Sequence, residues 1–288
     1  MEERTTTALK IFDCGVIGLT RTRPQKGVLL YTVRAFLACS TFACTTNIAR
    51  SLLPVPGPVN QSAEYAVIDG QDTLAFELVT TCARRIISDN DSRKPFAHIH
   101  YEAELGENGI PTVLSLEIWN NGASVEGPPS QFARHFAIGD TAFTQVWKGN
   151  KQQLQRAKSS PGSFPLVSGY VGLLSQLLRV LRAAGTNASI PIFYVGTGGE
   201  KGVALVSRDL PDSIVVQIDS SEFRAAWDDV AGLEGGQASR SGFHIVRTAL
   251  QPPEIATRRC DMPKLSPPKA IAVLHFAPLA GAFHQTGS

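Results

Sequence analysis

The stretch that decides the fold is residues 97–119, AHIHYEAELGENGIPTVLSLEIW. Apolar and polar residues alternate through Ala97–Glu104, the period of a half-buried β-strand, and Thr112–Trp119 is a second run of alternating or β-branched residues. Between these runs stands Gly106-Glu107-Asn108-Gly109-Ile110-Pro111, a cluster of turn-forming residues. The stretch therefore predicts a β-hairpin, and with it a sheet of mostly antiparallel strands.

Further strands and a few helices are expected around this hairpin. Leucines recur at three- and four-residue steps through Leu166–Ala184, and Gly185 follows as a stop signal, which predicts an amphipathic helix. Shorter helices are expected at Tyr31–Ala49, Leu78–Ser88 and Ser221–Leu233. The predicted fold class is α+β, a mostly antiparallel sheet with a few packed helices and extended N- and C-terminal arms.

Breaks in composition divide the chain into three parts. Pro54-Val55-Pro56-Gly57-Pro58 ends an N-terminal arm or helical segment, residues 1–60. Residues 61–250 are expected to form the α+β core. Prolines recur throughout residues 251–288, which excludes a continuous helix or a central strand and predicts a proline-rich C-terminal arm.

Composition restricts the class of protein. The 288 residues are 43% hydrophobic and 18% charged, which suffices for a sizeable core and excludes disorder of the whole chain. The five cysteines form no C-x-x-C pair, so we expect idle thiols in a reducing compartment. No signal peptide is evident, and the apolar run Val28–Cys44 is interrupted by Arg34. These features predict a soluble, intracellular, cytoplasmic protein with no membrane contact.

A cluster of histidine and acidic residues is the sharpest motif. His98, His100, Glu102 and Glu104 alternate along one predicted strand and would share one face of the sheet. The H-x-H with a later Glu is similar to the first half of the cupin metal motif, with His135 as a third imidazole. One alternative is therefore a metal-dependent β-barrel enzyme using His98, His100, Glu104 and His135. The other is structural histidines on a polar face.

A basic region is the second candidate site. Residues 141–199 contain no acid but six bases, and bases of this kind give sequence-independent contacts with phosphates. The N-terminal Arg21 and Arg23 could extend the same face. The nucleic-acid-binding residues expected are Lys148, Lys151, Arg156, Lys158, Arg179, Arg182, Arg21 and Arg23. An ordinary basic surface is the alternative. The glycine-rich stretch Gly196–Gly202 departs from the nucleotide-binding patterns and predicts a hairpin, and no cofactor is expected.

Bulk composition carries one resemblance. Alanine, serine and the 18 prolines make up about a quarter of the chain. In length and composition it resembles the proline-alanine-serine-rich proteins of polymycoviruses, fungal viruses with double-stranded RNA genomes. The resemblance implies a non-enzymatic, self-associating, capsid-like protein that coats double-stranded RNA without sequence specificity. Its partners would be the RNA and further copies of itself. A scaffold module that binds no nucleic acid is a third hypothesis.

Overall fold

The computed structural model describes residues 60–93, 96–120, 125–149, 151–196, 201–239 and 242–267. All of them belong to one compact unit, Leu52–Ser288. The expected helix Tyr31–Ala49 and most of the expected N-terminal arm lie outside these residues.

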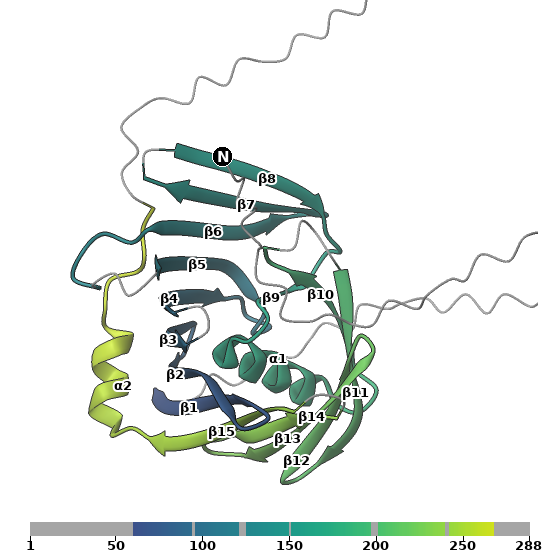
Figure 1. Ribbon diagram of the computed structural model, residues 1–288. Coiled ribbons are helices and arrows are strands. Elements are labelled where there is room, and N and C mark those ends of the chain that lie inside the picture. Colours follow the sequence, from purple (N-terminus) through teal and green to yellow (C-terminus); the bar gives the residue numbers. More distant parts are fainter. Residues whose placement is uncertain are drawn as a thin grey trace, which may run out of the picture. The chain divides into compact units, whose positions relative to one another are not determined.

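The described residues form one sheet of 15 strands and two helices (Figure 1). The sheet order is β8-β7-β6-β5-β4-β3-β2-β1-β15-β14-β13-β12-β11-β10-β9. Every pair of neighbours is antiparallel except β9 and β10, which are parallel. The elements are β1 (Gln61–Asp69), β2 (Asp72–Cys82), β3 (Arg85–Arg93), β4 (Phe96–Leu105), β5 (Pro111–Asn120), β6 (Gln131–Ile138), β7 (Thr141–Lys148), β8 (Lys151–Lys158), β9 (Phe164–Leu166), α1 (Val171–Ala184), β10 (Ser189–Tyr194), β11 (Lys201–Leu210), β12 (Ser213–Ile218), β13 (Ser221–Asp228), β14 (Gly232–Ala238), β15 (Phe243–Leu250) and α2 (Pro253–Cys260).

The α+β prediction is wrong, because the protein is mostly β. The expected helix Leu78–Ser88 is the end of β2, a turn and the start of β3, and Ser221–Leu233 is β13 with the turn into β14. Both segments contain apolar residues close enough together to suggest a helix. In the sheet, successive residues instead point to opposite faces: in β13, Phe223, Ala225 and Trp227 are buried and the residues between them are exposed.

The hairpin formed by β4 and β5 confirms the pattern in residues 97–119. Its strands pair from Ala97 opposite Asn120 to Leu105 opposite Pro111. The turn contains Gly109 at φ 74°, a left-handed conformation that glycine adopts without strain. The Asn108 side chain also accepts a hydrogen bond from the amide of Ile110 at 3.1 Å. Local turn chemistry therefore sets the register here.

Helix α1 lies inside the curve of the sheet and fills it (Figure 1). Leu173, Leu177, Leu178 and Leu181 are fully buried, and the sheet face that they contact is called the inner face below. The N-terminus of α1 is held by Glu77 of β2, whose carboxylate accepts hydrogen bonds from the amides of Val171 and Gly172 at 2.8 and 2.9 Å. A carboxylate at this end of a helix also faces the positive end of the helix dipole.

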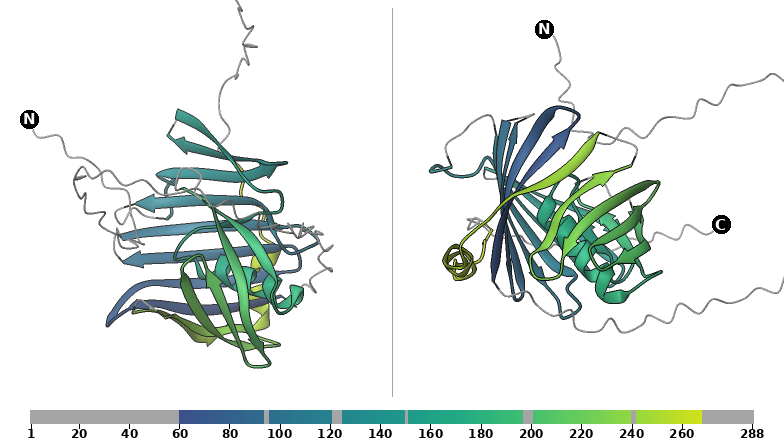
Figure 2. Two further views of the ribbon diagram at one scale, coloured as in Figure 1. Left: turned by 90° about the vertical axis from the view of Figure 1, so that its right-hand side faces the viewer. Right: turned by 90° about the horizontal axis from the view of Figure 1, so that it is seen from below.

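Helix α2 packs on the opposite, outer face against β1, β2 and β3 (Figure 2). A disulfide joins its last residue, Cys260, to Cys82 at the end of β2. The expectation that the cysteines are idle thiols is therefore wrong for these two. Residues 251–267 of the expected C-terminal arm lie along the sheet, and the rest of that arm is outside the described residues. Neither described helix is long and apolar enough to cross a membrane.

Candidate functional site

The basic residues of the β7–β8 hairpin are exposed. Lys148 ends β7, and β8 carries Lys151, Arg156 and Lys158, all exposed. None of the four forms an ion pair with a described acidic residue. These four residues, called the basic hairpin below, lie on two paired strands and not on a loop.

The basic hairpin carries its charges on both faces of the sheet. Residues opposite each other in a ladder share a face, and Arg156 lies opposite Phe143 of β7 while Lys148 lies opposite Lys151. Side chains alternate along each strand, so Arg156 and Lys158 project from the outer face and Lys148 and Lys151 from the inner face. The guanidinium of Arg156 lies 5.8 Å from the centroid of the Phe143 ring, within cation–π range.

The two arginines of α1 lie elsewhere in the molecule. Arg182 forms ion pairs with Asp209 at 3.6 Å and with Asp229 at 3.4 Å. Arg179 lies 5.9 Å from the centroid of the Trp227 ring, and its burial lowers the pKa of its guanidinium, against a smaller opposing effect of Tyr65. Both side chains thus contact the β11–β14 part of the fold, far along the sheet from β8 (Figure 1). Arg21 and Arg23 lie outside the described residues.

The expected metal ligands do not converge. His98, His100 and Glu104 lie on the outer face of β4, whereas His135 lies on the inner face of β6. His135 stacks on Phe193 of β10 with centroids 5.0 Å apart, and burial lowers its pKa to about 4. In the part of the chain that the structure describes, no three His, Cys, Asp or Glu side chains are placed to hold a metal ion. The four-residue metal site is therefore wrong.

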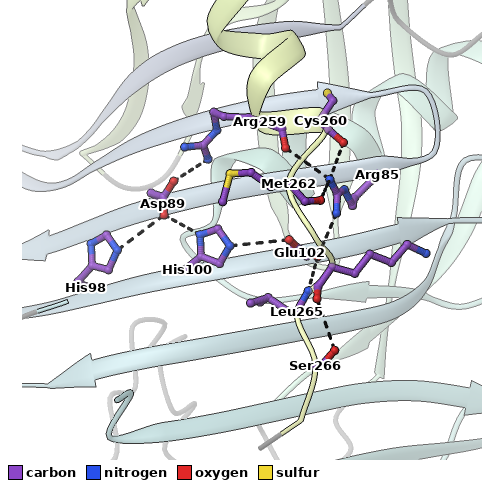
Figure 3. Close-up of polar contacts among 11 residues, drawn as sticks. Arg85, Asp89, His98, His100, Glu102, Arg259, Cys260, Met262, Leu265 and Ser266 are labelled. Atoms are coloured by element: carbon purple, nitrogen blue, oxygen red, sulfur yellow. Dashed lines mark hydrogen bonds and ion pairs between the residues drawn. The ribbon is translucent and has the colours of Figure 1, made fainter. Parts of the chain in front are cut away.

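The outer-face histidines instead surround Asp89 of β3 (Figure 3). His100 Nδ1 lies 2.6 Å from Asp89 Oδ1, and Arg259 of α2 lies 2.6 Å from the other oxygen. Burial disfavours the charged forms of both Asp89 and His100, but their hydrogen bonds and the charges of their neighbours favour the charged forms more strongly. They raise the pKa of His100 to about 9, chiefly through Asp89 and Glu102. They lower the pKa of Asp89 to about 2, chiefly through His100 and then Arg259.

Further contacts fasten α2 and the residues after it to this cluster. Arg85 donates hydrogen bonds to the carbonyl oxygens of Cys260 and Met262 at 2.7 and 2.9 Å. Lys264 pairs with Glu104 at 2.6 Å. The Leu265 amide donates to Glu102 at 2.9 Å (Figure 3). The cluster thus holds residues 253–265 against the outer face of the sheet. The shared face of His98, His100, Glu102 and Glu104 was detectable in the sequence. The contacts of Glu102 and Glu104 with the chain after α2 were not, because those partners lie at least 160 residues away.

Comparison with known proteins supplies no family for the chain. No family model matches, and no curated protein matches either. One similar solved structure is a DUF1089 family protein from Pseudomonas aeruginosa, with 8% identity, a TM-score of 0.39, and coverage of 57% of this chain and 89% of that one. Another is a β-barrel-like protein of the domain of unknown function DUF1849 from Brucella abortus. It has 9% identity, a TM-score of 0.37, and coverage of 67% and 98%. At these TM-scores we take neither fold nor function from either structure.

Proposed function

We propose that this protein is a binding module that contacts an anionic partner through the basic hairpin. The observation that carries the proposal is the exposure of Lys148, Lys151, Arg156 and Lys158 together, with no described acidic residue paired to them. Exposed cations of this kind attract anions over several ångströms and add affinity that falls as salt rises. The RNA-coating hypothesis requires the same property, and the contribution of Arg179 and Arg182 to it is reduced by their internal partners.

The disulfide bears on the compartment in which such binding takes place. Disulfides persist in oxidising compartments and are rare where thiol reductants are abundant. The link between Cys82 and Cys260 therefore supports a protein that works in an oxidising environment, in place of the cytoplasmic location expected from the sequence. Thiol titration of the unfolded, unreduced protein should find these two cysteines unreactive until a reductant is added.

The test of anion binding compares two neutralised variants of the full chain. In the first, the four bases of the basic hairpin are changed to Gln. In the control, four exposed bases elsewhere are changed to Gln, which gives the same net charge: Lys201, Arg208, Arg224 and Arg258. The probes are polyglutamate and duplex RNA, each in a salt series.

The hairpin variant should bind at least about fourfold more weakly than the control at low salt, since four exposed ion pairs contribute about 0.2–1 kcal/mol each. Its salt dependence should also be shallower. Equal binding by the two variants, or no binding by the wild-type protein to either probe at low salt, would refute the proposal.

A further inference from the structure

Strand β8 is an edge of the sheet that the described residues form. Its only described neighbour is β7, and seven of its eight residues are exposed. The ladder with β7 runs from Lys148–Lys151 to Thr141–Lys158 with no bulge, and the strand contains no proline. Proteins blunt an edge with bulges, prolines, short strands or charges. Here only the charges are present, so the backbone is ready to pair with another strand.

The direction of each backbone group in β8 follows from one hydrogen bond. The Ser159 amide donates to the carbonyl of Asp140, one step beyond the β7–β8 ladder. Hydrogen-bonded and non-hydrogen-bonded pairs alternate along an antiparallel ladder. The odd-numbered residues of β8 therefore bond to β7. The even-numbered residues, Gln152, Leu154, Arg156 and Lys158, direct their N–H and C=O groups to the open edge.

The charges of the basic hairpin select the strand that can pair there. A second copy of β8 would bring three more bases and no acid to this edge, so only like charges would gather there, and charges of one sign along an edge oppose edge-to-edge pairing. An acidic strand would instead bring charges of opposite sign next to the bases of β8. Its side chains alternate between the two faces, so they can reach Lys151 on the inner face and Arg156 and Lys158 on the outer face. A ligand that lies flat on one face reaches only half of the basic hairpin.

We propose that β8 binds an extended acidic segment of a protein partner as an added antiparallel strand. This inference rests on the proposed function and names the partner of the same surface. Acidic residues at positions 1, 3 and 8 of an eight-residue segment would lie opposite Lys158, Arg156 and Lys151. Main-chain hydrogen bonds to the even-numbered residues supply affinity, and the three acids set register and direction.

The experiment uses two labelled peptides and two variants of the full chain. The first peptide has Glu at positions 1, 3 and 8 in an otherwise Thr- and Val-based sequence, and the second has the same composition with Glu at positions 2, 5 and 6. Leu154→Pro removes one outward N–H without changing charge or the bonds to β7, since proline is tolerated where an edge N–H faces solvent. Leu154→Ser is its control, because it removes the same exposed side chain but keeps the N–H.

Wild-type protein should bind the first peptide at least about fivefold more tightly than the second, since the second places its acids opposite uncharged side chains. Leu154→Pro should weaken binding of the first peptide at least about fivefold relative to Leu154→Ser, the loss expected for a main-chain hydrogen bond and its neighbours. Hydrogen exchange should show new protection at the amides of residues 152, 154, 156 and 158 only.

Two outcomes would overturn strand addition while leaving the proposed function standing. One is equal peptide binding by the Leu154→Pro and Leu154→Ser proteins when the four-base hairpin variant has lost it. The other is binding of duplex RNA, but of neither peptide, by the basic hairpin. If the hairpin variant keeps all binding, the proposed function itself fails.

Discussion

Glu77 should be the side chain on which the docking of α1 most depends, and Glu77→Gln tests this. Its side chain is 1% exposed and its carboxylate accepts five hydrogen bonds. Three come from Ser88, Asn90 and Tyr101 at 2.7–3.0 Å, and two from the first amides of α1. Glutamine has the same shape, so the substitution leaves no cavity.

The stability lost in Glu77→Gln depends on which of the five hydrogen-bond donors can reorient. The hydroxyls of Ser88 and Tyr101 can rotate to accept from the new NH₂ group, and the amide of Asn90 can flip. The backbone amides of Val171 and Gly172 cannot, and one of them would face the NH₂ group whichever way the new glutamine side chain is turned. An unsatisfied buried N–H costs about 1–3 kcal/mol, and the remaining bonds lose their charge assistance. We expect the free energy of unfolding to fall by about 3 kcal/mol.

Denaturant unfolding followed by circular dichroism measures this loss, with the exposed Glu64→Gln of β1 as the control. A buried carboxylate also carries a desolvation cost that the variant relieves. If that cost dominated, Glu77→Gln would be as stable as the control or more stable. A difference below about 1 kcal/mol would therefore refute the assignment of Glu77 as the anchor of α1.

Other consequences of the geometry are also measurable. Replacing both Cys82 and Cys260 by Ser should lower the free energy of unfolding by about 2–5 kcal/mol, because the bond closes a loop across a sequence separation of 178; equal midpoints for oxidised wild type and variant would contradict this. The pKa of His100 is raised to about 9, so its contribution to stability should be complete below its unfolded value of about 6.5 and disappear as pH rises from 6.5 to 9. In His100→Asn that decline should be absent. In the wild-type protein, the loss of stability from protonating Asp89 should occur only as pH falls from about 4 towards 2.

Local patterns predicted the parts of the fold that local chemistry controls. The β4–β5 hairpin follows from its alternation and its glycine turn, and α1 lies within the predicted helix Leu166–Ala184. The helices expected at Leu78–Ser88 and Ser221–Leu233 failed because each window spans two strands and the turn between them. Apolar residues on both sides of a turn imitate helical spacing, and only pairing with distant strands shows which face each occupies.

In the candidate sites, too, features within one strand were predictable, and contacts between residues far apart in the sequence were not. Alternation along one strand correctly placed His98, His100, Glu102 and Glu104 on one face. It could not show that Arg259 and Lys264, at the far end of the chain, would pair with this face, or that Cys260 would bond to Cys82. The acid-free stretch 141–199 contains the basic hairpin, but its other arginines lie on a helix that the sheet encloses.

The energetics of β8 favour a role in binding over a role in stability. Burial of apolar surface is the main gain that offsets the conformational entropy lost by an ordered strand. In β8 only Ala157 is even partly buried, and Leu154 is 42% exposed, so this gain is small. The opposite edge of the sheet differs, since all three residues of β9 are buried. Contact with an added strand would bury Leu154 and satisfy the outward amides of β8. These are the stabilising contacts that β8 lacks within the described residues.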